Sequence, residues 1–163
     1  MSHTTLRPAT REDAGIILSF IRELAAYERM SDDVVATEEL LCEWIFDKQK
    51  AEVIFALEDG VEVGFALFFH NFSTFLGRAG IYLEDLFVKE AYRGRGHGKA
   101  LLCALARIAR ERGCGRLEWS CLDWNKPSID FYLSLGANPM TEWSVYRATG
   151  DALNALADMA EEA

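Results

Sequence analysis

The stretch from residue 79 to residue 122 constrains the fold most strongly, because it predicts two strands joined by a helix. AGIYLEDLFV (79–88) is typical of a strand, and glycines follow at positions 94, 96 and 98. A helical pattern then continues to about Arg112, and GRLEWSCL (115–122) predicts another strand. A helix between two strands is the kind of connection that parallel strands require. We therefore expect a sheet with at least one parallel pair.

The first half of the chain predicts antiparallel strands and two helices. AEVIFALEDGVEVGFALFFH (51–70) predicts two strands around Asp59-Gly60, a dipeptide that favours a tight hairpin. TLRPAT (5–10) predicts a short strand, and Thr10 is a good cap for a helix that continues to about Tyr27. TEELLCEWIF, from Thr37, predicts a second helix.

The last third of the chain predicts a helix, a strand and a terminal helix. Pro127 suits the first turn of a helix that Gly136 ends. MTEWSVYRA (140–148) predicts a last strand, and DALNALADMAEEA (151–163) predicts the terminal helix. Together the elements predict one α/β domain over residues 1–163, with an antiparallel beginning and a parallel pair in one mixed sheet.

Charge and composition exclude several classes of protein. The net charge of −9 argues against a nucleic-acid binder, although residues 93–116 hold seven of the 17 Lys and Arg and one acid. Residues 28–62 hold eleven acids and three bases, so one surface could attract an anion and another a cation, unless both are merely solvated faces. The longest apolar run, VGFALFF, is too short to span a membrane, and the N-terminus lacks a secretory pattern.

The four cysteines and three histidines show no metal-ligand spacing, so we expect no metal site. The cysteines form no CxxC pair. We therefore expect reduced, mostly buried thiols in a cytoplasmic protein.

The glycine turn before the helix that ends near Arg112 predicts a phosphate site. The N–H groups at a helix start have no partner inside the helix, and glycines remove the side chains that would cover them. Arg93, Arg95 and Lys99 would add mobile positive charge. Two familiar nucleotide motifs fail, because the third glycine of a dinucleotide fingerprint falls on Lys99 and the Walker pattern would need Ser or Thr at Ala100. A helix entry that is glycine-rich for no functional reason is the alternative.

Several motifs in order along the chain carry a resemblance to a known family. YLEDLFV, YRGRGHGKALL, WNKPSIDFYLSLGA and TEW occur in the order seen in spermidine/spermine and thialysine N-acetyltransferases of the GNAT superfamily. The resemblance covers roughly Leu6 to Tyr146. It implies a GNAT-like sheet whose parallel strands splay apart, and acetyl-CoA as the acyl donor.

The resemblance also implies where the donor binds. Its diphosphate would lie on the glycine turn, and its pantetheine arm would pair with the end of the preceding strand. A free backbone N–H near Leu86 or Phe87 would stabilise the oxyanion. The implied contacts are Leu86, Phe87, Val88, Arg93, Gly94, Arg95, Gly96, His97, Gly98, Lys99, Asn125 and Ser128.

The chemistry of amine acylation needs a base and an acid. An alkyl ammonium has a pKa of about 10.4, so it must lose a proton before it attacks. By resemblance Glu84 is the base, and Asp85, which should point to the opposite face of the strand, helps to hold a cationic chain. Tyr132 matches the family's acid for the departing thiolate. The alternatives are a solvated strand acid at Glu84 and a packing role for Tyr132 beside Phe131.

The resemblance implies a small cationic amine, held by carboxylates and aromatic rings. The implied contacts are Tyr27, Glu28, Glu84, Asp85, Glu142 and Trp143. Tyr27 and Trp143 could instead be core aromatics. Leu133, Ser134 and Leu135 stand where polyamine enzymes commonly carry basic residues, which puts polyamine specificity in doubt.

We therefore expect an N-acetyltransferase that acts by direct attack in a ternary complex and forms a homodimer, as its relatives usually do. One alternative is a catalytically weak acyl-CoA-binding sensor or partner module on the same fold. Another is an N-acetyltransferase for a different amine or for a protein N-terminus.

Overall fold

The structure, a computed structural model, describes residues 3–160. The chain divides into two compact units, the first of which ends at Ser120 while the second begins at Cys121. The single domain predicted over residues 1–163 stays a prediction.

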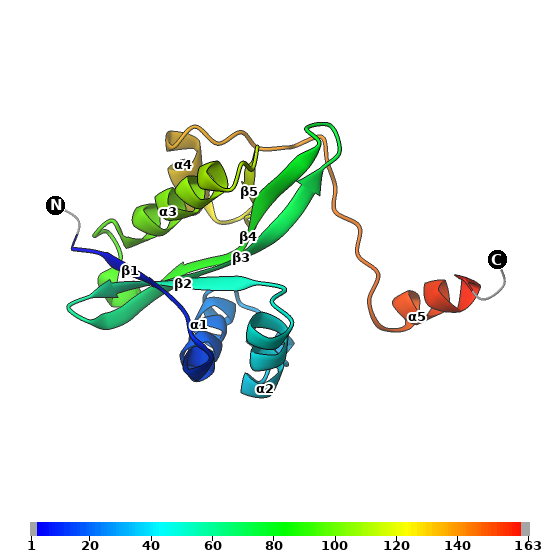
Figure 1. The fold of residues 1–163 in the computed structure, drawn as a ribbon, viewed down its shortest axis with the longest axis horizontal. Coiled ribbons are helices and arrows are strands. Elements are labelled where there is room, and N and C mark those ends of the chain that lie inside the picture. The colour runs from blue at the N-terminus through cyan, green and yellow to red at the C-terminus, as the bar shows by residue number, and fades with distance from the viewer. Residues whose placement is uncertain (1–2, 161–163) are drawn as a thin grey trace. The chain divides into compact units, whose positions relative to one another are not determined.

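The first unit is built on a five-stranded sheet with the strand order β1-β2-β3-β4-β5 (Figure 1). Neighbouring strands from β1 to β4 are antiparallel, and β4 and β5 are parallel. The mixed sheet with one parallel pair is confirmed. Its strands are β1 (Thr5–Pro8), β2 (Glu52–Glu58), β3 (Val61–Ser73), β4 (Arg78–Val88) and β5 (Leu117–Trp119).

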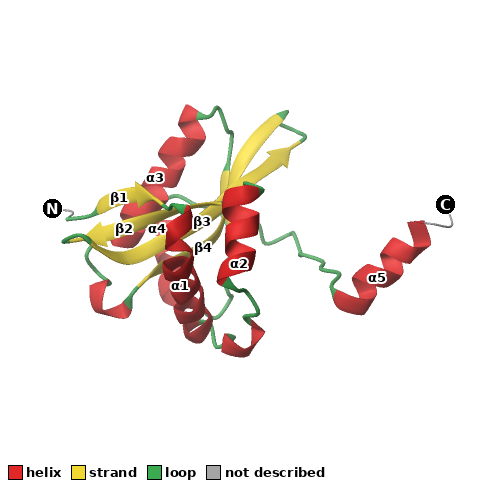
Figure 2. Ribbon diagram, turned by 60° about the horizontal axis from the view of Figure 1, so that its bottom comes forward, coloured by secondary structure: helices red, strands yellow, loops and turns green. Residues whose placement is uncertain are grey.

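Helices cover both faces of this sheet. Figures 1 and 2 show α1 and α2 on one face and α3 on the other. The helical elements of this unit are η1 (Arg11–Asp13), α1 (Ala14–Tyr27), η2 (Ser31–Asp33), α2 (Glu38–Leu41), η3 (Cys42–Asp47), η4 (Glu90–Tyr92) and α3 (His97–Glu111). The two helices predicted from Thr10 and Thr37 are therefore present, although the second continues as a π-helix in η3.

Local sequence explains where these elements begin and turn. The backbone N–H of Thr10 donates to the Asp13 carboxylate at 2.7 Å, which satisfies one donor at the start of η1 and α1. Asp59 and Gly60 both have positive φ values, 51° and 79°, as a two-residue hairpin of the predicted kind requires.

The core lies between the sheet and the two helical layers. On one face Phe20 of α1 stacks on Phe65 of β3, with ring centroids 5.1 Å apart, beside Phe55 of β2 and Phe87 of β4. On the other face α3 packs against β2, β3, β4 and β5, and its Leu101 and Leu105 are fully buried. Burial of this apolar surface provides the main stabilisation of the unit and fixes the path of β4.

The second unit contains α4 (Lys126–Ser134) and α5 (Gly150–Met159). The strand predicted over 140–148 is wrong, since those residues form no strand. A strand depends on ladder hydrogen bonds to a neighbour, so an alternating pattern alone does not produce one. Trp143, Val145 and Tyr146 are 77%, 86% and 94% exposed. Residues 161–163 of the predicted terminal helix lie outside the described residues.

Two further findings bear on the composition. Within residues 3–160, no helix has the length and apolar character needed to cross a membrane. All four cysteines are free thiols. Cys103 is exposed and the other three are half-buried, so the expectation of mostly buried thiols is wrong.

Candidate active site

The glycine turn leaves open space in front of the first N–H groups of α3. Gly94 and Gly96 have φ values of 77° and 88°, which favour glycine, and a Cβ added to either would meet no described atom within 4 Å. Gly96 is the N-cap of α3, and the first turn carries no acid. The places that side chains would take at Gly94 and Gly96 are therefore open, and the helix start retains its positive end, as an anion cradle needs.

Two side chains around this turn, Arg95 and His97, have partners on β2 and near the start of the chain. Arg95 forms an ion pair with Glu58 of β2 at 2.6 Å. The His97 ring, 2% exposed, lies 3.1 Å from the same carboxylate and 2.7 Å from the Thr4 hydroxyl. The Arg95 side chain remains 53% exposed in this pair, and its charge at the turn stays a prediction. His97 can offer a ligand its backbone N–H, since its ring is buried.

Arg93 is also engaged inside the first unit. Its guanidinium lies over the rings of Tyr27 and Phe87, at 4.9 and 5.3 Å from their centroids, and its Nε donates to the Val88 carbonyl at 2.9 Å. Its charge at the turn likewise stays a prediction. Arg93 instead connects the glycine turn with the end of α1 and the end of β4.

Within the described part of the first unit, one edge of β4 has no strand partner along the second half of the strand. The parallel ladder to β5 joins Ile81, Tyr82 and Leu83 to Leu117, Glu118 and Trp119, whereas β4 continues to Val88 with β3 as its partner. The N–H of Lys89 donates to Val63 of β3 at 2.9 Å. Because main-chain groups alternate in direction along a strand, those of Leu86 and Val88 point away from β3, toward the unpaired edge. An extended ligand could pair with this edge.

A β-bulge lies where this unpaired edge begins. Phe68 of β3 pairs with Leu83, and the next residue, Leu67, pairs with Asp85, which leaves Glu84 as the extra residue of β4. The expected alternation of Glu84 and Asp85 assumed a regular strand. The bulge interrupts that alternation, and no local pattern in the sequence indicates it. Glu84 is exposed and Asp85 is half-buried.

Asp85 has an unusual environment for a carboxyl group. Burial raises its pKa to about 7, and the negative charges of Glu84 and Glu28 add to the rise. Glu28 caps the C-terminus of α1, next to Tyr27, and burial raises its pKa as well. The first unit thus brings together the predicted residues Tyr27, Glu28, Glu84 and Asp85. Such a group of carboxylates suits a cationic ligand.

The second unit carries the remaining predicted residues. The Asn125 side chain, 8% exposed in total, accepts from the Ser128 N–H at 3.4 Å and so caps α4. Tyr132 lies on α4, with its ring 5.6 Å from that of Phe131. Glu142 and Trp143 are exposed. Trp143, at 77% exposure, is therefore not the core aromatic that was considered as an alternative.

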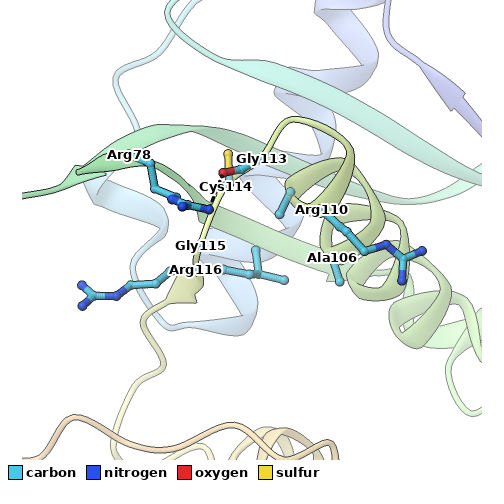
Figure 3. Close-up of a pocket in the computed structure, with 9 residues that line it drawn as sticks. Arg78, Ala106, Arg110, Gly113, Cys114, Gly115 and Arg116 are labelled. Carbon is cyan, nitrogen blue, oxygen red and sulfur yellow. Dashed lines mark hydrogen bonds between the residues drawn. The ribbon is translucent and has the colours of Figure 1, made fainter. Parts of the chain in front are cut away.

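A second concave region lies at the opposite end of α3 from the glycine turn (Figure 3). It has a volume of about 400 Å³ and is lined by Arg78, Arg110, Cys114 and Arg116, among others. Figure 3 shows Arg110 and Arg116 extending away from each other, and Arg78 donates to the Gly113 carbonyl at 3.4 Å. Cations complement the negative end of a helix, so these arginines have a structural explanation.

Two contacts of the candidate site were missed by the sequence analysis. Glu58 and Thr4 fix the glycine turn through His97. Thr4 is 93 residues from His97 along the chain, so no local pattern connects them. The hairpin turn at Asp59-Gly60 was predicted, and it places Glu58 at the end of β2. The position of Glu58 directly before this predicted turn was the one indication of its place that the sequence offered.

Comparison with known proteins gives consistent similarities. The Acetyltransferase (GNAT) family pattern matches residues 18–137. A Bos taurus protein described as thialysine N-epsilon-acetyltransferase is 39% identical, over 96% of this chain and 99% of its own. The L-ornithine N5-acetyltransferase NATA1 of Arabidopsis thaliana is 34% identical, over 93% of this chain and 86% of its own. Integron cassette protein VCH_CASS6 from the mobile metagenome of V. cholerae superposes with a TM-score of 0.80 at 31% identity, over 96% and 98% of the two chains.

Proposed function

Because the chain belongs to the GNAT acetyltransferase family, we propose that it transfers an acetyl group from acetyl-CoA to a primary amine of a small cationic molecule. One observation supports this most directly: the unpaired edge of β4 connects the glycine turn with a group of three carboxylates. The turn suits a diphosphate, the edge suits the amide-rich pantetheine arm, and the carboxylates suit an ammonium group.

The substrate proposal uses the names of the relatives. Thialysine and ornithine, named for two of them, are amino acids with a primary amine at the end of the side chain. We place such diamino acids beside polyamines as the first candidates. Tyr27, Glu28 and Asp85 would hold the cationic chain in the first unit, and Glu142 and Trp143 would contribute from the second.

The proposed reaction is a direct attack in a ternary complex. A carboxylate at the bulge, Glu84 or Asp85, takes one proton from the ammonium group, and the neutral nitrogen attacks the thioester carbonyl. The Leu86 N–H points to the unpaired edge and would stabilise the oxyanion. As the C–S bond breaks, Tyr132 gives its proton to the sulfur and regains one from the nitrogen of the intermediate.

The test of this function is thiol release from acetyl-CoA with a panel of spermidine, spermine, putrescine, thialysine, ornithine, lysine and N-terminal peptides. We expect release that depends on a diamino acid or a polyamine. CoA binding without amine-dependent release from any member would contradict the proposal and favour a sensor or partner module. Light scattering of the same sample tests the proposed homodimer, and fractionation of cells tests the proposed cytoplasmic location.

The acid role of Tyr132 has its own test. Tyr132→Phe keeps the ring and removes the proton, so we expect a fall in kcat of about 10²–10⁴-fold. The affinity for CoA, measured by calorimetry, should remain unchanged. Phe131→Tyr, on the adjacent position of α4, is the matched control and should leave kcat within a few fold. Full activity of Tyr132→Phe would remove Tyr132 from the mechanism.

A further inference from the structure

We infer that Asp85, and not the adjacent Glu84, accepts the proton that the attacking amine releases. This inference rests on the proposed acetyl transfer and assigns one of its steps. It departs from the expectation of the sequence, which gave Glu84 this role and left Asp85 to hold the substrate.

The first observation in support of Asp85 is the register between β3 and β4. Cross-strand partners point to the same face of a sheet, so Asp85 shares a face with Leu67, and Phe87 shares that face with Phe65. This is the face that α1 covers, because Leu67, Phe65 and Phe87 all belong to the core beside Phe20. The bulge therefore places Asp85 over the packed α1 side of the sheet, next to the end of α1. Glu84 is the extra, exposed residue of the bulge.

The second observation in support of Asp85 is its position along β4. The ladder to β5 ends at Leu83, so Asp85 belongs to the first residues of β4 that have no β5 partner. Its neighbour Leu86 directs its N–H to that unpaired edge. A thioester carbonyl that accepts a hydrogen bond from the Leu86 N–H would lie one residue from Asp85 along the strand. One residue of a strand corresponds to a rise of about 3.3 Å.

The charged groups around Asp85 explain why it can act as a base near neutral pH. Glu28 faces it from the end of α1, Glu84 lies beside it on β4, and its partner on β3 is the apolar Leu67. The causes that act on the Asp85 pKa, burial and the charges of Glu84 and Glu28, all raise it.

Two cations near this end of the sheet, Arg93 and Lys89, have other partners. Arg93 lies over Tyr27 and Phe87, and Lys89 lies 3.8 Å from Glu23 and over Phe20. Burial and the two negative neighbours accordingly raise the Asp85 pKa to about 7, the range that suits a general base at pH 7.

The proton balance is complete with groups already named. Asp85 takes one proton from the ammonium group and releases it to solvent after the reaction. The nitrogen then forms its bond to the carbonyl carbon, and the C–S bond breaks. The second nitrogen proton reaches the sulfur by way of Tyr132, so that the products are the amide, CoA thiol and one proton in solution.

The experiment is the pH dependence of kcat for thiol release at saturating amine, from pH 5.5 to 9.5, in the full chain. The wild type should lose activity on the acid side with an apparent pKa near 7. Asp85→Asn should lower kcat at pH 7 by about 10²–10⁴-fold and abolish that limb. Its activity should recover in part toward pH 9.5, where more of the amine is neutral in solution.

Glu84→Gln is the discriminating variant, because it removes a negative neighbour but not the inferred base. It should keep at least about a tenth of kcat, and its acid limb should move to lower pH, since the charge of Glu84 raises the pKa of Asp85. Glu111→Gln, at the exposed C-terminal end of α3, is the matched control and should leave the profile unchanged.

Two results would overturn the inference. One is an Asp85→Asn variant that retains kcat and the acid limb. The other is a Glu84→Gln variant that loses the limb together with activity, an outcome that holds even when Asp85→Asn does not fold. Absence of amine-dependent release from the wild type would contradict the proposed function instead. Titration of the Asp85 carboxyl carbon by NMR in the free protein gives a separate readout, and a pKa below 5 would also overturn the inference.

Discussion

Two aspartates of the first unit, Asp13 and Asp85, show how opposite surroundings direct the same side chain to opposite tasks. Asp13, at the start of α1, forms an ion pair with Arg7 at 2.8 Å and accepts the Thr10 N–H at 2.7 Å. These contacts hold its pKa at about 2. Asp85 is half-buried beside Glu84 and Glu28, and its pKa is raised to about 7.

The difference separates a carboxylate that stabilises the fold from one that destabilises it. Asp13 is bound more tightly as an anion in the folded chain than in the unfolded chain, so its charge favours folding at neutral pH. Asp85 binds its proton more tightly in the folded chain, so its ionisation opposes folding. A group that destabilises the structure while it lies beside an unpaired strand edge is a stronger candidate for chemistry than one held by a partner.

The largest expected effect is a gain in stability when Asp85 is replaced. In the wild type the Asp85 contribution is most favourable below about pH 4, decreases as the pH rises to about 7, and is constant above that. Asp85→Asn should therefore raise the free energy of unfolding by roughly 4 kcal/mol at pH 8 and change it little at pH 4. Urea unfolding at the two pH values measures this, and equal changes at both would contradict the raised pKa.

The next effect in size is a loss of stability when Asp13 is replaced. Its contribution is present above about pH 4 and is lost as the pH falls to about 2. Asp13→Asn should therefore lower the free energy of unfolding by roughly 2 kcal/mol at pH 7, a difference that shrinks toward pH 2. Asp130→Asn, in an exposed pair with Lys126, is the control and should stay within about 0.5 kcal/mol. A pH-independent loss in Asp13→Asn would assign the effect to packing.

The contrast between the two aspartates also shows what the sequence could predict. Asp13 stands three residues after Thr10, and the sequence correctly predicted Thr10 as the cap that begins this helical segment. The hairpin at Asp59-Gly60 and the α3 turn were predicted for the same reason, since each depends on backbone preferences of a few neighbouring residues. The strand predicted over 140–148 failed because a strand needs a partner that local sequence does not supply.

The candidate site was predicted by residue but not by arrangement. Glu84 and Asp85 were both named, yet their surroundings depend on a bulge set by the register between β3 and β4. The engagement of Arg95 by Glu58 likewise joins residues 37 positions apart. Charge counted along the chain therefore indicated cations at the glycine turn, whereas their partners are set by packing between distant segments.

The smallest expected effect is a difference in how salt acts on the two carboxyl groups. The pKa of Asp85 is raised first by burial, which salt does not change, and then by repulsion from Glu84 and Glu28, which salt screens. Raising the ionic strength from 0.1 to 1 M shortens the screening length from about 10 to about 3 Å, so the Asp85 pKa should fall by a few tenths of a unit. The Asp13 pKa should rise slightly, because the same screening weakens the attraction of Arg7. Carboxyl NMR titrations in both salts measure the two shifts, and an Asp85 pKa that rises or does not change would show that repulsion has no part in its environment.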